Sequence, residues 1–362
     1  MTFRAPTRLL LSVPRSLALP AAGVDISSGS VKCMQFSVEH GRLAVGAYAQ
    51  MSVPEGVFVD GDIEKEDAVV DILRTLRLKH RVRNAVASLS ERKSYLYQSL
   101  IPGDTKDLRG AVEFELEAHV PIPPSEVIFD FEVARRTSQG TVVAVTAFAK
   151  RLIETYERVF SASGITLRAL EVESHALVRA TLSQKDLGRV VMIVDMGKRS
   201  TRIAVSDHGA VSYTATVDFG GDMLTQALMK RFSIEVQAAE EMKNAKGFLF
   251  GADNTDVVDA VGSSISVLRD EIVRHLSYWN NPGADDVPRD PITRIVVVGG
   301  NANMLGLPEY LSGALYLPVV VANVWQNVFS LDDYIPSMPM NESLEYAPAI
   351  GLAKKYALNC LW

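Results

Sequence analysis

The chain has 362 residues, of which 48% are hydrophobic and 22% charged, and its formal net charge is −6. This length predicts two to three domains with a core each, and the acidic balance argues against bulk nucleic-acid binding. The two cysteines, Cys33 and Cys360, show neither metal-site spacing nor a disulfide framework, which favours a reducing compartment.

Residues 1–22 are predicted to form a flexible tail. They contain two short apolar runs and Arg4, Arg8 and Arg15, as a secretion signal or a weakly membrane-touching basic segment also would. Pro14 and Pro20 interrupt the apolar run that a signal needs. No apolar run reaches the roughly 18 residues that span a bilayer. We therefore expect a tail rather than a leader.

Residues 23–100 predict a β-rich unit. Apolar runs at 23–26, 31–38 and 41–53 alternate with turn residues and read as strands. Residues 67–79 have apolar side chains at helical spacing, and a short buried strand begins at Asn84. The pattern is that of a hairpin-rich sheet with one covering helix.

A second module begins near Pro102. A helix is expected from Asp104 to His119, capped by Asp104 or Thr105 and ended by the prolines that follow. Strands at 126–134 and 141–149, a helix at 150–163, a strand at 165–173 and a helix at 174–183 come next. This is an α/β module.

From Gly188 onward the opening pattern returns. Strands are expected at 189–195, 201–207 and 209–219, helices at 222–232, 236–246 and 263–281, and a buried strand at 292–300. A short helix at 307–315, a strand at 318–323 and a final helix at 347–357 complete the chain. The segments VDISSGSVKCMQF and VDMGKRSTRIAV form a weak internal repeat, which indicates two similar domains.

A polar turn follows the first predicted strand. A tight hairpin points several backbone N–H groups at one place, which suits phosphate oxygens, and hydroxyl and ammonium groups add donors. The alternative is an ordinary polar hairpin, because short glycine and serine turns are common. The candidate phosphate-binding residues are Ser27, Ser28, Gly29, Ser30 and Lys32, and Asp25 could hold Mg²⁺ through water.

The second copy places a similar turn after the strand that ends at Asp195. Two strand-ending aspartates, Asp25 and Asp195, would suit metal-assisted binding of a triphosphate. An ordinary hairpin is again the alternative. The candidates from this turn are Asp195, Gly197, Ser200 and Thr201.

Two further motifs are associated with predicted helices, one just before a helix and one within a helix. Gly220 and Gly221 precede a helix whose N-terminus favours phosphate, although Asp222 could simply cap that helix. Glu240 and Lys243 share one helix face and could both reach a ribose, although a surface ion pair explains them equally.

The fifth motif is a buried strand that ends in Gly299 and Gly300. Two glycines leave room for a flat ring against the backbone, while Asn301 and Asn303 either contact a ligand or make turns. Each motif is weak alone. Their order, with a strand before each turn and a spacing that spans two lobes, is much more specific.

In this order the motifs resemble the actin, Hsp70 and sugar-kinase superfamily of ATP-binding proteins. The resemblance implies an α/β, two-lobed actin-like ATPase fold of duplicated ribonuclease H-like domains that binds ATP and Mg²⁺. The first two turns would clasp phosphate, the Glu240–Lys243 helix would meet the ribose, and the Gly299–Gly300 turn would meet adenine. Within the superfamily, residues 114–123, 126–133 and 347–353 closely resemble the PilM family, the cytoplasmic actin-like proteins of type IV pilus assembly.

The resemblance also implies a division of the chain and an extra subdomain in lobe one. The expected units are a tail at 1–22, subdomain 1A at 23–100, the inserted subdomain 1C at 101–183, subdomain 2A at 184–220 with 291–362, and subdomain 2B at 221–290.

A partner is implied as well. PilM proteins hold the N-terminal peptide of the inner-membrane protein PilN between the first subdomain and the inserted one. Leu116, Val120 and Ile122 are the residues expected to line such a groove. The alternative is that these three form the core of the inserted subdomain.

Two departures from the family pattern concern hydrolysis more than binding. Ser27 stands where family members usually have glycine, and Gly29 could move the flexible position by two residues. Lys198 and Arg199 stand where the second turn usually has small residues, and two cations could strengthen phosphate binding or crowd the site.

The expected function is an ATP-binding scaffold at the cytoplasmic face of the inner membrane. It would reach the membrane through PilN, link to the pilus motor and support twitching motility, with at most slow ATPase activity, because no residue of the turns is an obvious general base. Two alternatives stay open. One is a small-molecule kinase of the same superfamily, which needs a polar substrate pocket with a catalytic carboxylate in lobe one. The other is a filament protein resembling the cell-division protein FtsA.

Overall fold

The computed structural model describes residues 21–39, 41–103, 105–251, 254–283 and 287–357. The expectations for the N-terminal tail, for Asp104 as a helix cap and for Cys360 fall outside these residues. No helix within the described ranges has both the length and the apolar character needed to cross a bilayer.

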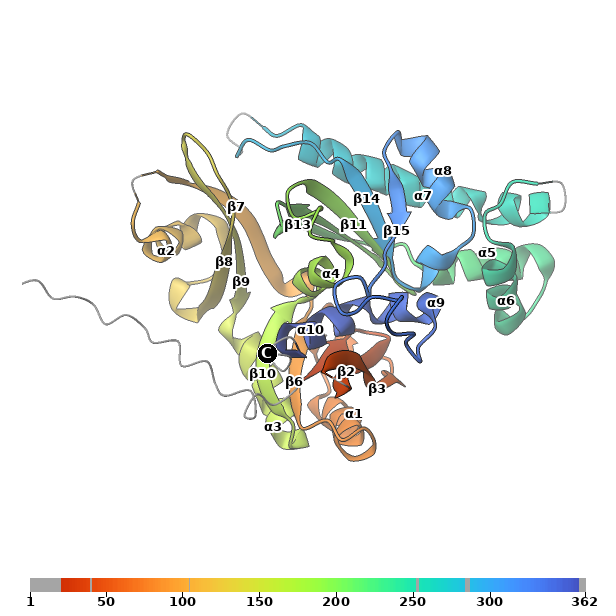
Figure 1. Cartoon of the computed structure of the whole chain (residues 1–362), viewed down its shortest axis with the longest axis horizontal. Helices are drawn as coiled ribbons and strands as arrows, with labels where there is room; N and C mark the ends of the chain where they lie inside the picture. Colours follow the sequence, from red (N-terminus) through yellow and green to blue (C-terminus); the bar gives the residue numbers. More distant parts are fainter. Residues whose placement is uncertain (1–20, 40, 104, 252–253, 284–286, 358–362) are drawn as a thin grey trace, which may run out of the picture.

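Two five-stranded sheets form the two lobes (Figure 1). The first has the order β10-β6-β1-β2-β3 and consists of β1 (Ala22–Ile26), β2 (Ser30–Glu39), β3 (Arg42–Ser52), β6 (Asn84–Leu89) and β10 (Thr166–Val172). The second has the order β13-β12-β11-β14-β15 and consists of β11 (Val190–Met196), β12 (Thr201–Asp207), β13 (Ala210–Val217), β14 (Arg294–Val298) and β15 (Val319–Val321).

The two sheets share one topology. In each sheet, three consecutive strands pair antiparallel. A later strand pairs in parallel with the free side of the first of them, and one more strand pairs in parallel with that one. The predicted duplication is thus confirmed at the level of strand order. Both central strands, β1 and β11, are buried along their whole length, as expected of strands covered on both faces.

Helices cover the first sheet on both faces. α1 (Glu66–Lys79) packs against α3 (Lys150–Ser163) over one face, and α4 (Glu173–Thr181) packs against α10 (Ala347–Ala357) over the other. Gly23 allows α10 to lie this close, because a Cβ there would lie 1.9 Å from the carbonyl oxygen of Ala349. The final helix, expected within subdomain 2A, therefore packs on the sheet of the first lobe.

The second sheet is covered by α7 (Thr255–Asn280), with α5 (Gly221–Phe232), α6 (Val236–Lys246) and α8 (Leu307–Leu315) around it. α7 begins eight residues before the predicted start at Ser263. Apolar side chains continue at helical spacing through Val257, Val261 and Ile265, and their burial against the sheet outweighs the low helix propensity of Gly262 and its serine neighbours.

The inserted module is a three-stranded sheet with one helix. Its strand order is β7-β9-β8, from β7 (Ser94–Pro102), β8 (Val127–Arg136) and β9 (Gly140–Ala149), and α2 (Leu108–His119) packs on it. The side chain of Asp107 caps α2 by accepting a hydrogen bond from the Gly110 N–H at 3.0 Å, so Thr105 does not begin the helix.

The expected limits of the inserted subdomain, 101–183, need correction. β7 begins at Ser94, and β10 pairs in parallel with β6 over Thr166↔Asn84 to Val172↔Leu89. The segment from α3 to α4 therefore belongs to the first lobe. Because apolar runs look alike in both sheets, periodicity could not assign this strand.

The smaller elements are β4 (Phe58–Val59), β5 (Asp62–Ile63), α9 (Met340–Ser343) and 3₁₀ turns at Glu91–Lys93, Pro124–Glu126, Gly300–Asn303 and Leu344–Tyr346.

Candidate functional site

The first and second turns line one cavity of about 550 Å³ between the lobes. Ser27 and Ser28 contribute from the first turn, and Arg199 and Ser200 contribute from the second. Arg92, beside β7, contacts Asp218 across the cleft at 2.7 Å. The two repeats thus bring their turns together, as the internal repeat predicts.

The first turn is closed by its own serine. The Ser27 hydroxyl donates to the carbonyl oxygen of Ser30 at 2.9 Å, and the Ser30 N–H donates back to that hydroxyl at 3.2 Å. Gly29 lies at an open tip, where a Cβ would meet nothing within 4 Å. Its φ is not positive. Gly29 therefore does not take over a left-handed position from the usual glycine. Where a glycine would make the turn flexible, Ser27 holds it with hydrogen bonds between its side chain and Ser30.

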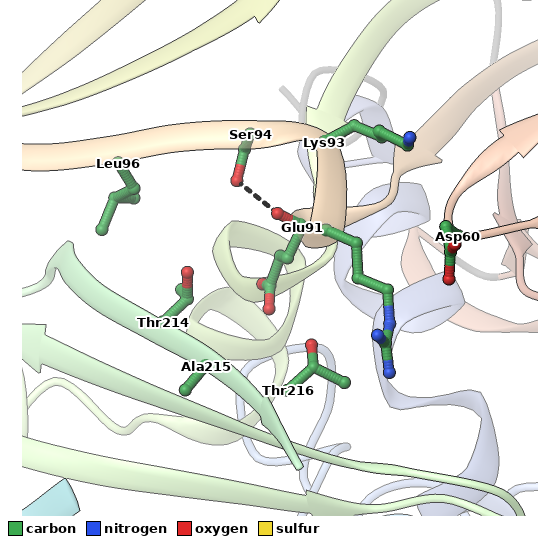
Figure 2. A pocket seen from close by; sticks show the side chains of 9 residues that line it. Asp60, Glu91, Lys93, Ser94, Leu96, Thr214, Ala215 and Thr216 are labelled. Carbon is green, nitrogen blue, oxygen red and sulfur yellow. Dashed lines mark hydrogen bonds between the residues drawn. The ribbon is translucent and has the colours of Figure 1, made fainter. Parts of the chain in front are cut away.

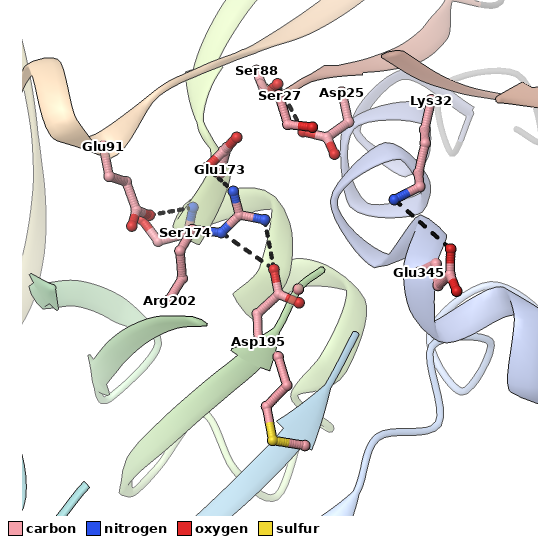
Figure 3. A network of polar contacts seen from close by, with 12 residues as sticks. Asp25, Ser27, Lys32, Ser88, Glu91, Glu173, Ser174, Asp195, Arg202 and Glu345 are labelled. Atoms are coloured by element: carbon pink, nitrogen blue, oxygen red, sulfur yellow. Dashed lines mark hydrogen bonds and ion pairs between the residues drawn. The ribbon is translucent and has the colours of Figure 1, made fainter. Parts of the chain in front are cut away.

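Behind the turns lies a buried charge network that the sequence analysis missed (Figure 3). Arg202 of β12 donates from Nη2 to Oδ2 of Asp195 at 2.6 Å and from Nε to the same oxygen at 3.2 Å. Its Nη1 donates to Glu173, at the N-terminus of α4 in the first lobe. One arginine thereby joins the two lobes at the base of the cleft.

Two more buried carboxylates flank this arginine. Asp25 accepts a hydrogen bond from the Ser88 hydroxyl at 2.9 Å, and Oε1 of Glu91 accepts one from the Ser174 N–H at 2.8 Å. Burial raises the pKa of Glu91, and Arg202 only partly offsets it. Burial likewise raises the pKa of Glu173 to about 8, so Glu173 holds a proton near neutrality.

The metal expectation fits this arrangement poorly. Within the described ranges, no group of three or more His, Cys, Asp or Glu side chains is arranged to hold a metal ion. The Asp195 carboxylate already binds a guanidinium, and the Asp25 carboxylate binds a hydroxyl. Asp25 and Asp195 are therefore not a free pair awaiting Mg²⁺, which requires near-octahedral oxygen coordination.

Hydrogen bonds join the second turn to the third and fifth motifs. The Gly221 N–H donates to the Gly197 carbonyl oxygen at 3.1 Å, and the Asp222 N–H donates to that of Lys198 at 2.9 Å. Asn301 donates from Nδ2 to Gly197 at 2.9 Å. The glycines are needed for this packing, because a Cβ on Gly220 would lie 2.4 Å from the Lys198 carbonyl oxygen.

The fourth motif forms a compact triad with Thr225 of α5. The Thr225 hydroxyl donates to Glu240 at 2.7 Å, Lys243 donates to that hydroxyl at 3.2 Å, and Lys243 contacts Glu240 at 2.8 Å. Lys243 is buried. Burial raises the pKa of Glu240, but bonds from Lys243 and Thr225 outweigh it and hold that pKa below its usual range. This is more than a surface ion pair.

Other predicted residues have contacts within the protein. Nζ of Lys32 lies 4.0 Å from Oε2 of Glu345. The Thr201 hydroxyl donates to the carbonyl oxygen of Phe219 at 2.8 Å, and Nδ2 of Asn303 donates to the carbonyl oxygen of Asn341 at 2.7 Å. Gly299 has φ 90°, and a Cβ on it would lie 2.5 Å from Oδ1 of Asp195, while one on Gly300 would lie 2.6 Å from Oε1 of Glu345.

Among the described residues, the inter-lobe cavity is lined by both turns and by Asp218, which precedes the glycines of the third motif, but not by Gly220, Gly221 or the fourth and fifth motifs. The third and fifth motifs adjoin it through hydrogen bonds to the back of the second turn.

A second, polar cavity of about 490 Å³ adjoins the first (Figure 2). It lies between Ser94 and Leu96 of β7 and Thr214 and Thr216 of β13. Glu91 lines both cavities, and its buried Oε2 has no hydrogen-bond partner in the described part of the chain. The cleft therefore continues past the turns towards the inserted module.

The largest of these cavities, about 790 Å³, lies between the inserted module and the first lobe. Its walls include residues 128–132 of β8 and 167–172 of β10, so we call it the β8–β10 groove. Successive side chains of a strand point to opposite faces, so consecutive residues line one cavity only where the strand edge faces it. β8 and β10 each end their sheets, which leaves backbone N–H and C=O groups available at the groove.

The residues expected to line a peptide groove lie elsewhere. Leu116 and Val120 are buried in the core of the inserted module, and Ile122 packs against that core. None of the three is among the groove-lining residues of the described chain. Helical spacing shows which face of α2 is buried, but not whether a partner or a sheet buries it.

Comparisons with known proteins agree with this architecture. A family model described as "Type IV pilus assembly protein PilM" matches residues 23–356. A solved structure titled "PilM-PilN type IV pilus biogenesis complex" has a TM-score of 0.73 at 23% identity and covers 94% of this chain and 99% of that chain. MreB5 of Spiroplasma citri bound to ADP has a TM-score of 0.52 at 16% identity, with 87% and 94% covered. These two likenesses show the actin-like fold.

Curated relatives include the cell division protein FtsA of Neisseria meningitidis serogroup B, 28% identical over 247 residues, which cover 60% of this chain and 56% of that protein. FtsA of Pseudomonas aeruginosa is 28% identical over 196 residues and is covered over 46% of its length. The chain thus spans about half the length of the curated relatives it matches.

Proposed function

The chain belongs to the type IV pilus assembly protein PilM family, and on that premise we propose that it is a nucleotide-binding scaffold that holds a membrane protein's peptide. The nucleotide is ATP, and the peptide is the N-terminal segment of PilN. The protein lies at the cytoplasmic face of the inner membrane and reaches it through that peptide.

The cavity shared by the two turns supports the nucleotide part. Serine hydroxyls of the first turn and Arg199 of the second face one space of about 550 Å³ between the lobes. The triad of Thr225, Glu240 and Lys243 lies beside the second turn, where Lys198 also lowers the pKa of Glu240. Phosphates bound between the turns and a ribose bound near this triad would contact the motifs in the order in which they occur in the chain.

The β8–β10 groove carries the peptide part. An extended peptide gains backbone hydrogen bonds when it adds to an open sheet edge, and side-chain pockets supply specificity. Two open edges face this groove, and apolar side chains such as Ile128, Phe131 and Leu170 line it. It is long enough for several residues, because five or six consecutive residues of each strand contribute.

Fluorescence polarisation with a labelled PilN N-terminal peptide tests the proposal directly. We expect saturable binding, and a change in affinity on adding ATP, because α4 begins at the inter-lobe network and follows directly after β10 at the groove. A scrambled peptide of the same composition is the control. Equal binding of both peptides would rule out the scaffold role. A peptide affinity that ATP does not change would show that the two sites are not coupled.

A filament protein is the second candidate, favoured by the partial likeness to FtsA. Sedimentation and negative-stain microscopy with ATP would separate the two: polymers would favour it, and a monodisperse protein that binds the peptide would favour the scaffold.

A small-molecule kinase is the third candidate. A kinase requires a polar pocket and a catalytic carboxylate. The polar cavity beside the turns, and Oε2 of Glu91, which has no hydrogen-bond partner in the described chain, support this candidate. A screen of hydroxylated substrates with labelled ATP tests it. Phosphoryl transfer that disappears in Glu91→Gln would favour a kinase.

A further inference from the structure

Arg202 has an unusual place for a cation in a nucleotide cleft. Its side chain is 19% exposed and lies between the lobes, with Asp195 on its own lobe and Glu173 on the other. Asp25 and Glu91 act on it electrostatically as well. Its single positive charge therefore stands at the centre of four carboxylates, where charge interactions are poorly screened.

The guanidinium and a divalent ion would compete for the same oxygens. Oδ2 of Asp195 accepts two bonds from Arg202, and Glu173 accepts a third. A hydrated Mg²⁺ beside Asp195 would have to displace these bonds and lie next to a fixed positive charge. Arg202 thus already supplies the positive charge that a metal would bring to Asp195 and Glu173.

Arg202 also retains donors for a ligand. A guanidinium has five N–H groups, and three of them make the bonds given above within the described chain. Arg202 lines the same cavity as Ser27, Ser28 and Arg199. The remaining N–H groups can donate to phosphate oxygens, a geometry for which arginine is well suited.

We propose that Arg202 is a built-in counter-charge that replaces the divalent cation, so that the cleft binds its nucleotide without Mg²⁺. This rests on the proposed nucleotide function and specifies its cofactor requirement. The usual expectation for an actin-like cleft, ATP with Mg²⁺ between Asp25 and Asp195, does not fit the side chains of this chain.

Calorimetric titration of ATP, in MgCl₂ and in excess EDTA, tests the proposal. The wild-type dissociation constants should agree within about threefold in the two buffers. Arg202→Ser frees Asp195 and Glu173, so its affinity should become metal-dependent and fall at least tenfold in EDTA, about 1.4 kcal/mol. Arg202→Lys keeps a cation and should remain less metal-dependent than Arg202→Ser.

A matched control removes a different arginine–carboxylate pair, at the second sheet. Arg294 contacts buried Asp186 at 3.1 Å, at the end of β14 opposite the cleft. Arg294→Ser should keep the metal independence of the wild type. Thermal unfolding without nucleotide gives a second reading: MgCl₂ should raise the melting temperature of Arg202→Ser and leave those of the wild type and Arg294→Ser unchanged.

The outcomes separate the two ideas. Wild-type ATP binding that is lost in EDTA overturns the counter-charge and leaves the nucleotide function intact. Absence of ATP binding in both buffers, with an intact melting transition, overturns both. If Arg202→Ser does not fold, the wild-type comparison alone decides.

Discussion

The side-chain amide of Asn301 lies 2.9 Å from the carbonyl oxygen of Gly197 and donates a hydrogen bond to it. This bond joins the end of β14 to the second turn, about 100 residues earlier in the chain. Asn301 therefore supports the turn from behind, which is a positioning role, and its contact with a ligand stays a prediction.

Gly221→Ala should disturb this support. The added Cβ would lie 2.3 Å from Oδ1 of Asn301, so the amide must move away from Gly197. We expect a loss of about 1–3 kcal/mol in the free energy of unfolding, measured with urea. Gly262→Ala in α7 is the control: its Cβ meets nothing within 4 Å, and alanine in a helix should be neutral or stabilising by up to about 1 kcal/mol. Equal effects of the two substitutions would contradict this interpretation.

Ile128→Asp should weaken PilN peptide binding at least tenfold, about 1.4 kcal/mol. Ile128 lines the β8–β10 groove and is 43% exposed, so a carboxylate there opposes an apolar peptide without entering the core. Val133 is on the same strand, is 42% exposed and is not a groove-lining residue, so Val133→Asp should change the affinity less than threefold. Fluorescence polarisation measures both, and a comparable loss in the two variants would rule out the groove.

The pH dependence of stability should report on Glu173. Burial raises its pKa to about 8, against the lowering effect of Arg202 and with further raising by Asp25, Glu91 and Asp195. The folded state then binds more protons than the unfolded state, whose reference pKa is 4.5. The stabilisation is complete below pH 4.5 and is lost as the pH rises towards 8.

Glu173→Gln cannot titrate, so its melting temperature should fall less steeply across this range than that of the wild type. Glu171→Gln is the control, because bonds from Arg179 and Lys355 outweigh burial and lower the pKa of Glu171. Parallel wild-type and Glu173→Gln curves would show that another group carries the dependence.

Asp107→Ala should loosen the inserted module. Its carboxylate caps α2, and removal of such a cap costs about 0.5–2 kcal/mol. Hydrogen exchange should therefore quicken in residues 108–119. Thr105→Ala, at the position expected from sequence to cap the helix, should leave exchange there unchanged. Faster exchange in Thr105→Ala would restore the earlier cap assignment.

The two similar lobes were foreseeable because burial leaves a local trace. The runs around Val24 and Val194 are apolar on both faces, as strands covered on both sides must be, and each is followed by the same kind of turn. Two copies of one pattern predict two similar lobes. The β10 strand was misassigned because its local pattern does not say which sheet it joins.

The sequence by itself determined the duplicated lobes, the two polar turns after their first strands and the helices with one apolar face, because these depend on neighbours within a few residues. Tertiary structure alone decided that Arg202 binds carboxylates of both lobes, that Leu116 faces a core and that two sheet edges form a groove. Arg202 and Glu173 are 29 residues apart in the chain, and the two strands of the groove belong to different sheets, so these groups meet only once the chain has folded. No short-range pattern encodes which partner each will meet.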